Sequence, residues 1–179
     1  MIWTIFVLVL LVVVLWVFYV SWRASRLDRL HNRVEAARAA LDLALVRRAS
    51  AAADLASSGQ LDPATSVLLA DAVRRARKAD PAGRDLAESD LTRALRATLG
   101  DPELRRELRD GDPDGQAGLL EGVEKASQQV YIARKFYNDL AGRTSDARRK
   151  PLARVLRLSG SAPPPRFFDM DDTLTDGDG

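Results

Sequence analysis

The segment that follows Met1 is almost entirely apolar, and this restricts what it can fold into more than any other feature of the chain. Residues 2–20 hold 18 apolar side chains and a single polar one, Thr4, with no charge. As a helix, this segment would be about 28 Å long, close to the ~30 Å hydrocarbon thickness of a bilayer. In lipid, only a helix satisfies every backbone group of a single span. The sequence therefore predicts a transmembrane anchor, assigned to residues 1–22.

Aromatic residues lie at both ends of the apolar segment, where amphipathic rings prefer the interface between membrane and water. They are Trp3 at one end and Trp16, Tyr19 and Trp22 at the other. The alternative is a cleaved signal peptide, which needs a basic N-terminal region and small residues at the cleavage site. Residues 1–3 are uncharged, and the sequence VSWR at 20–23 is a poor cleavage site. We therefore expect an anchor that is not cleaved.

Arginines follow the apolar segment, whereas no basic side chain precedes it. The first four are Arg23, Arg26, Arg29 and Arg33. Because cytoplasmic flanks of membrane spans carry an excess of Lys and Arg, we expect the N-terminus outside and the C-terminal domain in the cytoplasm. These four arginines also lie where they would contact anionic lipid headgroups.

The charged residues are unevenly distributed, although the formal net charge is only +2. All 27 Lys and Arg lie between Arg23 and Arg166, and five Asp but no basic residue occur in residues 169–179. The chain has no cysteine and a single histidine, His31. A disulfide framework, a thiol nucleophile and a zinc finger are therefore excluded. We assign no catalytic residue, no cofactor and no metal site.

A helical period begins after the anchor and predicts an all-α fold. No Gly or Pro interrupts residues 22–58, which predicts one long helix ending near Gly59. A second long helix is expected over residues 116–141, with Gly142 as its stop. Each carries a seam with spacings of three and four, which favours shallow packing in an antiparallel bundle. The seams are Leu27, Leu30, Val34, Ala37, Leu41, Ala44 and Arg48, and Val123, Ala126, Val130, Ala133, Tyr137 and Leu140.

Shorter helices are expected between the two long ones. Asp62-Pro63 and Asp101-Pro102 each provide an N-cap followed by proline at the first helical position. A third helix, marked by Leu86, Leu91, Leu95 and Leu99, should end at Gly100. The bundle is assigned to residues 23–142 and a basic, proline-rich segment to 143–168. Residues 169–179 are acidic and rich in turn residues, which predicts a disordered tail.

Three stretches occur in an order that is similar to a known family. They are LHNRVE at 30–35 with its continuation to residue 49, VYIARKFYN at 130–138, and PRFFD at 165–169. They resemble the first cytoplasmic helix, the A-R-R-F-Y-N signature and the aromatic-aromatic-acid ending of the LemA family of bacterial membrane-anchored proteins. The resemblance covers nearly the whole chain. It implies an antiparallel helical bundle on one N-terminal anchor in the bacterial inner membrane, with no established catalytic activity.

The second of these stretches leaves two interpretations open. In the first, Tyr137 and the adjacent Phe136 fill the bundle core, while Arg134 and Asn138 make polar contacts at its edge. In the second, Arg134 and Asn138, which are four apart on one helical face, contribute to a surface that binds a partner.

A further motif, in the C-terminal tail, resembles the signature sequence of a class of enzymes. DMDDTL at 169–174 matches the D-x-D-x-T-L signature of phosphatases of the haloacid dehalogenase type. There, the first aspartate (here Asp169) attacks phosphorus, and the second (here Asp171, after Met170) acts as the general acid and base. This chemistry needs a preceding strand and a long α/β domain with Mg²⁺. A proline run precedes the motif and four residues follow Thr175, so a phosphatase is the weaker alternative.

The features together predict a membrane-tethered, non-enzymatic scaffold or adaptor on the cytoplasmic face of the bacterial inner membrane. Family analogy associates it with envelope or membrane-protein quality control. Its expected partners are the membrane and a protein of unknown identity, and a homo-oligomer is compatible with the sequence. A lipid-headgroup-binding module that uses the basic residues 143–157 is the main alternative. No nucleic-acid partner is expected, because the sequence lacks a recognisable nucleic-acid-binding module.

Overall fold

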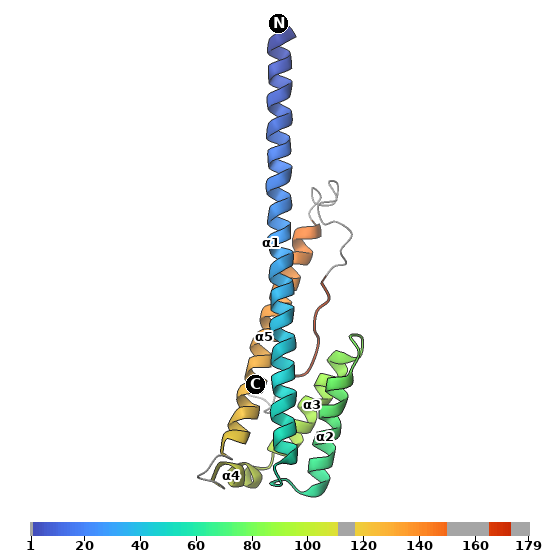
Figure 1. The fold of residues 1–179 in the computed structure, drawn as a ribbon, viewed down its shortest axis with the longest axis vertical. Coiled ribbons are helices and arrows are strands. Elements are labelled where there is room, and N and C mark those ends of the chain that lie inside the picture. Colours follow the sequence, from blue (N-terminus) through green and yellow to red (C-terminus); the bar gives the residue numbers. More distant parts are fainter. Residues whose placement is uncertain (1, 111–116, 150–164, 173–179) are drawn as a thin grey trace. The chain divides into compact units, whose positions relative to one another are not determined.

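The computed structural model describes residues 2–110, 117–149 and 165–172, and every secondary-structure element within these ranges is an α-helix (Figure 1). The all-α prediction is therefore confirmed for the described residues. The chain divides into two compact units, Met1–Ala37 with Asn138–Phe167, and Arg38–Tyr137 with Phe168–Gly179. In chain order, the helices are α1 (Ile2–Ser57), α2 (Pro63–Lys78), α3 (Arg84–Leu99), α4 (Pro102–Asp110) and α5 (Ala117–Arg149).

The first unit contains an apolar helical segment that is long enough to cross a membrane. Ile2–Tyr19 has a mean hydropathy of 2.8, and none of it is buried within the protein. Such an apolar surface is unfavourable in water and favourable in lipid, where the helix also satisfies its own backbone groups. Length and composition alone also fit a signal sequence near the N-terminus.

The end of α5 also belongs to the first unit, and this helix runs through Gly142 to Arg149. The prediction that Gly142 ends the helix is wrong. Glycine within a helix costs only about 1 kcal/mol relative to alanine, so it does not stop a helix by itself. Phe167 lies beside this glycine. A Cβ added to Gly142 would be 3.8 Å from the nearest atom of the phenyl ring. The helix therefore continues across a position that carries no side chain and contacts an aromatic ring.

The second unit is a helical bundle with an alanine- and leucine-rich core. Residues from all five helices form one buried cluster, which includes Ala49, Ala52 and Leu55 of α1, Leu69 and Val73 of α2, Leu91 and Leu95 of α3, Leu108 of α4 and Val123 of α5. The many alanines allow close approach of the helices, while the leucines provide most of the buried area.

The two predicted seams are buried wherever the structure describes their side chains, apart from Ala133, which is half-buried. The side chains of Leu27 and Leu30 lie outside the described residues. Leu86 is 67% exposed, unlike the other leucines of α3. It precedes Leu91 by five residues, and a spacing of five places two side chains on different faces of a helix.

Aspartates begin α2 and α4, as the sequence predicts. Asp62 accepts hydrogen bonds from the backbone amides of Ala64 and Thr65, both at 3.0 Å. Asp101 accepts from the amide of Glu103 at 2.8 Å. These bonds satisfy N–H groups that have no partner within the helix. At the end of α1, Gly59 has a φ of 76°, a left-handed conformation that glycine adopts without a steric cost.

The cap of α2 gives a prediction about acid stability. Hydrogen bonds from the side chain and backbone of Thr65 lower the pKa of Asp62 below its ordinary value of 3.8. A depressed pKa means that the charged cap stabilises the folded state above the unfolded pKa, and that this stabilisation is lost as pH falls through the folded pKa. We expect Asp62→Asn, which keeps the cap but cannot titrate, to lose less thermal stability than the unmodified protein between about pH 5 and about pH 2.

Melting curves from circular dichroism of the two full chains in detergent would measure this difference. Asp71, whose pKa is lowered by its hydrogen bond from Arg74, titrates in both chains. Its contribution therefore cancels in the comparison. Parallel losses of stability in the two chains would contradict the prediction.

Candidate functional site

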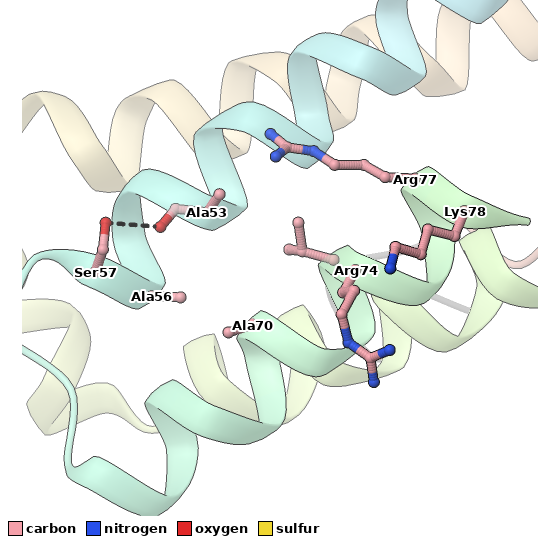
Figure 2. A pocket seen from close by; sticks show the side chains of 8 residues that line it. Ala53, Ala56, Ser57, Ala70, Arg74, Arg77 and Lys78 are labelled. Carbon is pink, nitrogen blue, oxygen red and sulfur yellow. Dashed lines mark hydrogen bonds between the residues drawn. The ribbon is translucent and has the colours of Figure 1, made fainter.

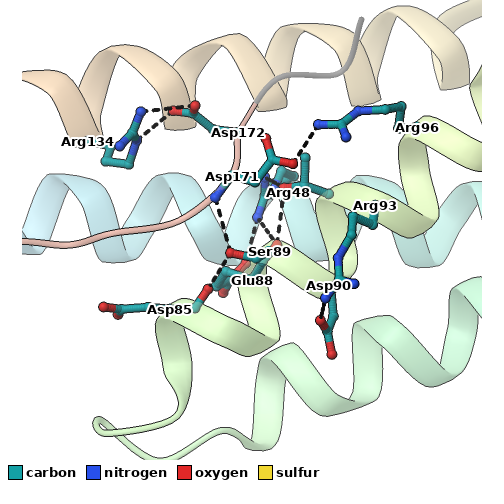
Figure 3. A network of polar contacts seen from close by, with 11 residues as sticks. Arg48, Asp85, Glu88, Ser89, Asp90, Arg93, Arg96, Arg134, Asp171 and Asp172 are labelled. Carbon is teal, nitrogen blue, oxygen red and sulfur yellow. Dashed lines mark hydrogen bonds and ion pairs between the residues drawn. The ribbon is translucent and has the colours of Figure 1, made fainter. Parts of the chain in front are cut away.

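One face of α3 holds the last described segment of the chain in an extended conformation (Figure 3). The backbone amide of Asp169 donates to the carboxylate of Asp85 at 3.4 Å, and that of Asp171 donates to the hydroxyl of Ser89 at 3.1 Å. Two residues of extended chain rise about 6.6 Å, and four residues of helix rise about 6.0 Å. Because these two distances nearly match, alternate amides of the segment meet successive turns of α3.

The acidic side chains of the segment pair with arginines on two different helices. Asp171 accepts from Arg96 of α3 at 2.7 Å. Asp172 forms a two-point pair with Arg134 of α5, in which Nε lies 2.6 Å from Oδ2 and Nη2 lies 3.0 Å from Oδ1. The Asp172 side chain is only 4% exposed. Two-point guanidinium–carboxylate pairs are geometrically specific, and burial reduces their screening by salt.

An apolar side chain completes the docking of this segment. Met170 is 5% exposed, whereas its neighbour Asp169 is exposed. This alternation follows from the extended backbone, in which successive side chains point to opposite sides. The sequence predicts disorder from residue 169 onward, and residues 169–172 differ from that prediction. Residues 173–179 lie outside the described part of the chain.

A buried ion pair joins α1 to α3 within the same unit. Arg48 is fully buried, and its Nη2 lies 2.8 Å from the carboxylate of Glu88, which is 2% exposed. Its Nη1 donates to the hydroxyl of Thr92 at 2.9 Å, and Nη2 also donates to the backbone carbonyl of Glu88 at 3.2 Å. The Thr92 hydroxyl donates to that same carbonyl at 3.1 Å. The charge of Arg48 is thus neutralised, and most of its donors are satisfied (Figure 3).

The polar pairs are arranged so that α3 connects the docked segment to the bundle interior. Glu88 and Thr92 of α3 hold Arg48, and Ser89 and Arg96 of the same helix hold the segment. One signal for the buried pair is visible in the sequence, since Arg48 occupies a seam position that is otherwise apolar. The sequence carries no such signal for the partners of the segment. Arg96 and Ser89 lie 75 and 82 positions from Asp171 along the chain, too far for a local pattern to connect them.

The four residues of the family-like signature have different environments. Tyr137 is buried, as the core interpretation predicts, but Phe136 is 59% exposed and does not fill the core. The two are adjacent, and only Tyr137 follows the seam spacing. Arg134 binds Asp172, a contact that the sequence does not predict. Asn138 is half-buried.

The residues predicted at the membrane interface lie on α1. The rings of Trp3, Trp16, Tyr19 and Trp22 are exposed, and Trp3 packs near Phe6. Arg29 and Arg33 are also exposed. The side chains of Arg23 and Arg26 lie outside the described residues, as does most of the basic segment 143–157.

The described part of the bundle includes two hollows lined by residues of known position. The larger, of about 420 Å³, has a floor of small side chains from α1 and α2 and a rim of three basic residues, Arg74, Arg77 and Lys78 (Figure 2). Arg77 is anchored there by the hydroxyl of Ser50 at 3.2 Å. The smaller, of about 250 Å³, lies beside the docked segment and is lined by Asp172, Ser127 and Tyr131, among others. The Ser127 hydroxyl is buried and has no hydrogen-bond partner among the described residues.

The phosphatase-like motif is described only as far as Asp172. Asp171, the position of the general acid and base, is paired with Arg96. The residues before it, from 165 onward, form neither a helix nor a strand. Within the described ranges, no three His, Asp or Glu side chains are grouped closely enough to hold a metal ion.

Comparisons with known proteins provide no relative from which a function can be transferred. No protein-family model matches the chain, and neither a curated protein nor a solved structure matches it.

Proposed function

We propose that this chain is a single-pass protein of the bacterial inner membrane that acts as a non-enzymatic scaffold or adaptor through its cytoplasmic helical bundle. The observation that carries the proposal is the continuity of α1. This one helix begins with an apolar segment exposed over its whole length and ends with Ala49, Ala52 and Leu55 in the bundle core. The candidate membrane span and part of the bundle core thus belong to the same helix.

Three further features support this function. The arginines that follow the apolar segment favour a cytoplasmic bundle. The order of the three stretches similar to LemA proteins favours an antiparallel bundle on a bacterial anchor. The carboxylates of Glu88, Asp171 and Asp172 pair with arginines, an arrangement typical of structural polar contacts. A link with envelope or membrane-protein quality control rests on the family resemblance alone.

The absence of cysteine allows a direct test of the orientation. Val67→Cys places one thiol on an exposed position of α2, and Ile2→Cys places one at the other end of the apolar segment. We expect a membrane-impermeant maleimide to label Ile2→Cys in intact spheroplasts and to label Val67→Cys only after lysis. Labelling of Val67→Cys in intact spheroplasts would contradict the cytoplasmic location, and with it the proposed class of partner.

A further inference from the structure

We propose that the face formed by α3 and α5 is a binding site for an extended peptide of a partner protein, in which an apolar residue is followed by two aspartates. The chain's own Met170-Asp171-Asp172 occupies this site and shows the chemistry that it accepts. This inference rests on the proposed adaptor function, because it specifies the partner that the adaptor would hold.

Some contacts between the bundle and the docked segment do not depend on the sequence of the segment, whereas others do. The amides of residues 169 and 171 donate to Asp85 and Ser89, and any extended peptide could form these two bonds. Selection comes from Arg96, Arg134 and the buried position of Met170. The two arginines bind two successive aspartates. Because Arg96 and Arg134 lie on different helices, a peptide must be extended to reach both.

The core cluster that joins the five helices does not include the docked segment. The core cluster consists of residues from the five helices together with Leu61, and Met170 is not a member of it. Arg96 and Asp171 remain partly exposed, at 23% and 39%. The pair of Arg96 and Asp171 is therefore open to solvent, and we expect a peptide supplied by another protein to compete for this site.

Binding in trans has to compete with binding in cis. The chain's own segment acts at a high effective concentration because it is covalently attached. An unmodified chain would therefore bind a partner weakly until its own segment is displaced. The double variant Asp171→Asn/Asp172→Asn weakens the cis contacts and leaves Arg96 and Arg134 unchanged.

The test measures fluorescence anisotropy of a labelled peptide with the sequence of residues 165–172, added to full chains in detergent micelles. We expect the double variant to bind it at least about tenfold more tightly than the unmodified chain, because the cis competitor is weakened. Adding Arg134→Gln to the double variant should weaken binding by about tenfold or more, since a two-point ion pair is lost. Equal binding by all three chains, or no binding by the double variant, would overturn the proposal.

A charge exchange keeps the test decisive if the double variant folds poorly. Arg134→Asp repels the chain's own Asp172, and a peptide carrying Asp172→Arg can restore the pair with reversed charges. We expect this peptide to bind the Arg134→Asp chain and not the unmodified chain. Its failure to discriminate between them would overturn the proposal. The labelling experiment on orientation is independent of peptide binding, so the two proposals can fail separately.

Discussion

Replacing Arg48 by methionine is expected to lower the free energy of unfolding by about 3–5 kcal/mol, because it leaves the buried carboxylate of Glu88 without its counter-charge. Glu88→Gln should be destabilising for the reciprocal reason. The double change Arg48→Met/Glu88→Leu should recover much of the loss, since two apolar side chains of similar volume can replace a buried pair. This recovery distinguishes loss of a charge partner from loss of packing.

Urea unfolding of the full chain in detergent, followed by circular dichroism, would measure these effects. A loss of 3–5 kcal/mol corresponds to a midpoint shift of at least ~1 M at slopes of about 1–3 kcal/mol/M. Arg47→Met is the matched control, because the same substitution is made one position away on an exposed side chain. If the control and Arg48→Met unfold at the same urea concentration, the buried pair does not make the expected contribution to the free energy of unfolding.

Two arginines in the middle of the apolar segment should release the protein from the membrane. Val9 and Val13 lie one turn apart and are exposed. Each arginine costs about 2.5–3.5 kcal/mol at the centre of a span, so the pair removes about 5–7 kcal/mol of insertion free energy. We expect most of the Val9→Arg/Val13→Arg chain to leave the carbonate-resistant membrane fraction.

The control adds the same two charges to the bundle. Val67 and Leu68 of α2 are each 69% exposed, so Val67→Arg/Leu68→Arg should leave the membrane fraction unchanged. The mass of the purified unmodified chain tests the alternative, a signal peptide, because cleavage would remove the apolar segment from the mature protein. A truncated mass, or a membrane fraction that the span arginines do not affect, would contradict an uncleaved anchor.

Local signals predicted most of the helices. Asp62 and Asp101 cap their helices as expected because a cap depends only on residues two or three positions away. The seams on α1 and α5 follow from a period that one helix sets by itself. Gly142 shows the limit of such signals, since its ability to end a helix is weak and Phe167, far along the chain, lies against it.

The candidate site was much less predictable than the helices. Arg134 was identified as part of a signature, but its partner Asp172 was assigned to a disordered tail on composition. Composition measures the average cost of ordering an acidic segment and cannot include specific pairing with distant arginines. Phe136 shows a different error, because it does not follow the seam spacing on which the buried Tyr137 lies.

The buried pair also bears on how uniquely α1 packs. Around Arg48, the buried face of α1 alternates leucines (Leu41, Leu45 and Leu55) with alanines (Ala44, Ala49 and Ala52), and the alanines distinguish poorly between one turn and the next. A slip of one turn, about 5.4 Å, would move the guanidinium away from Glu88 and leave both charges unpaired in the interior. The charged pair therefore adds to the buried leucines a strong penalty against any other register of α1.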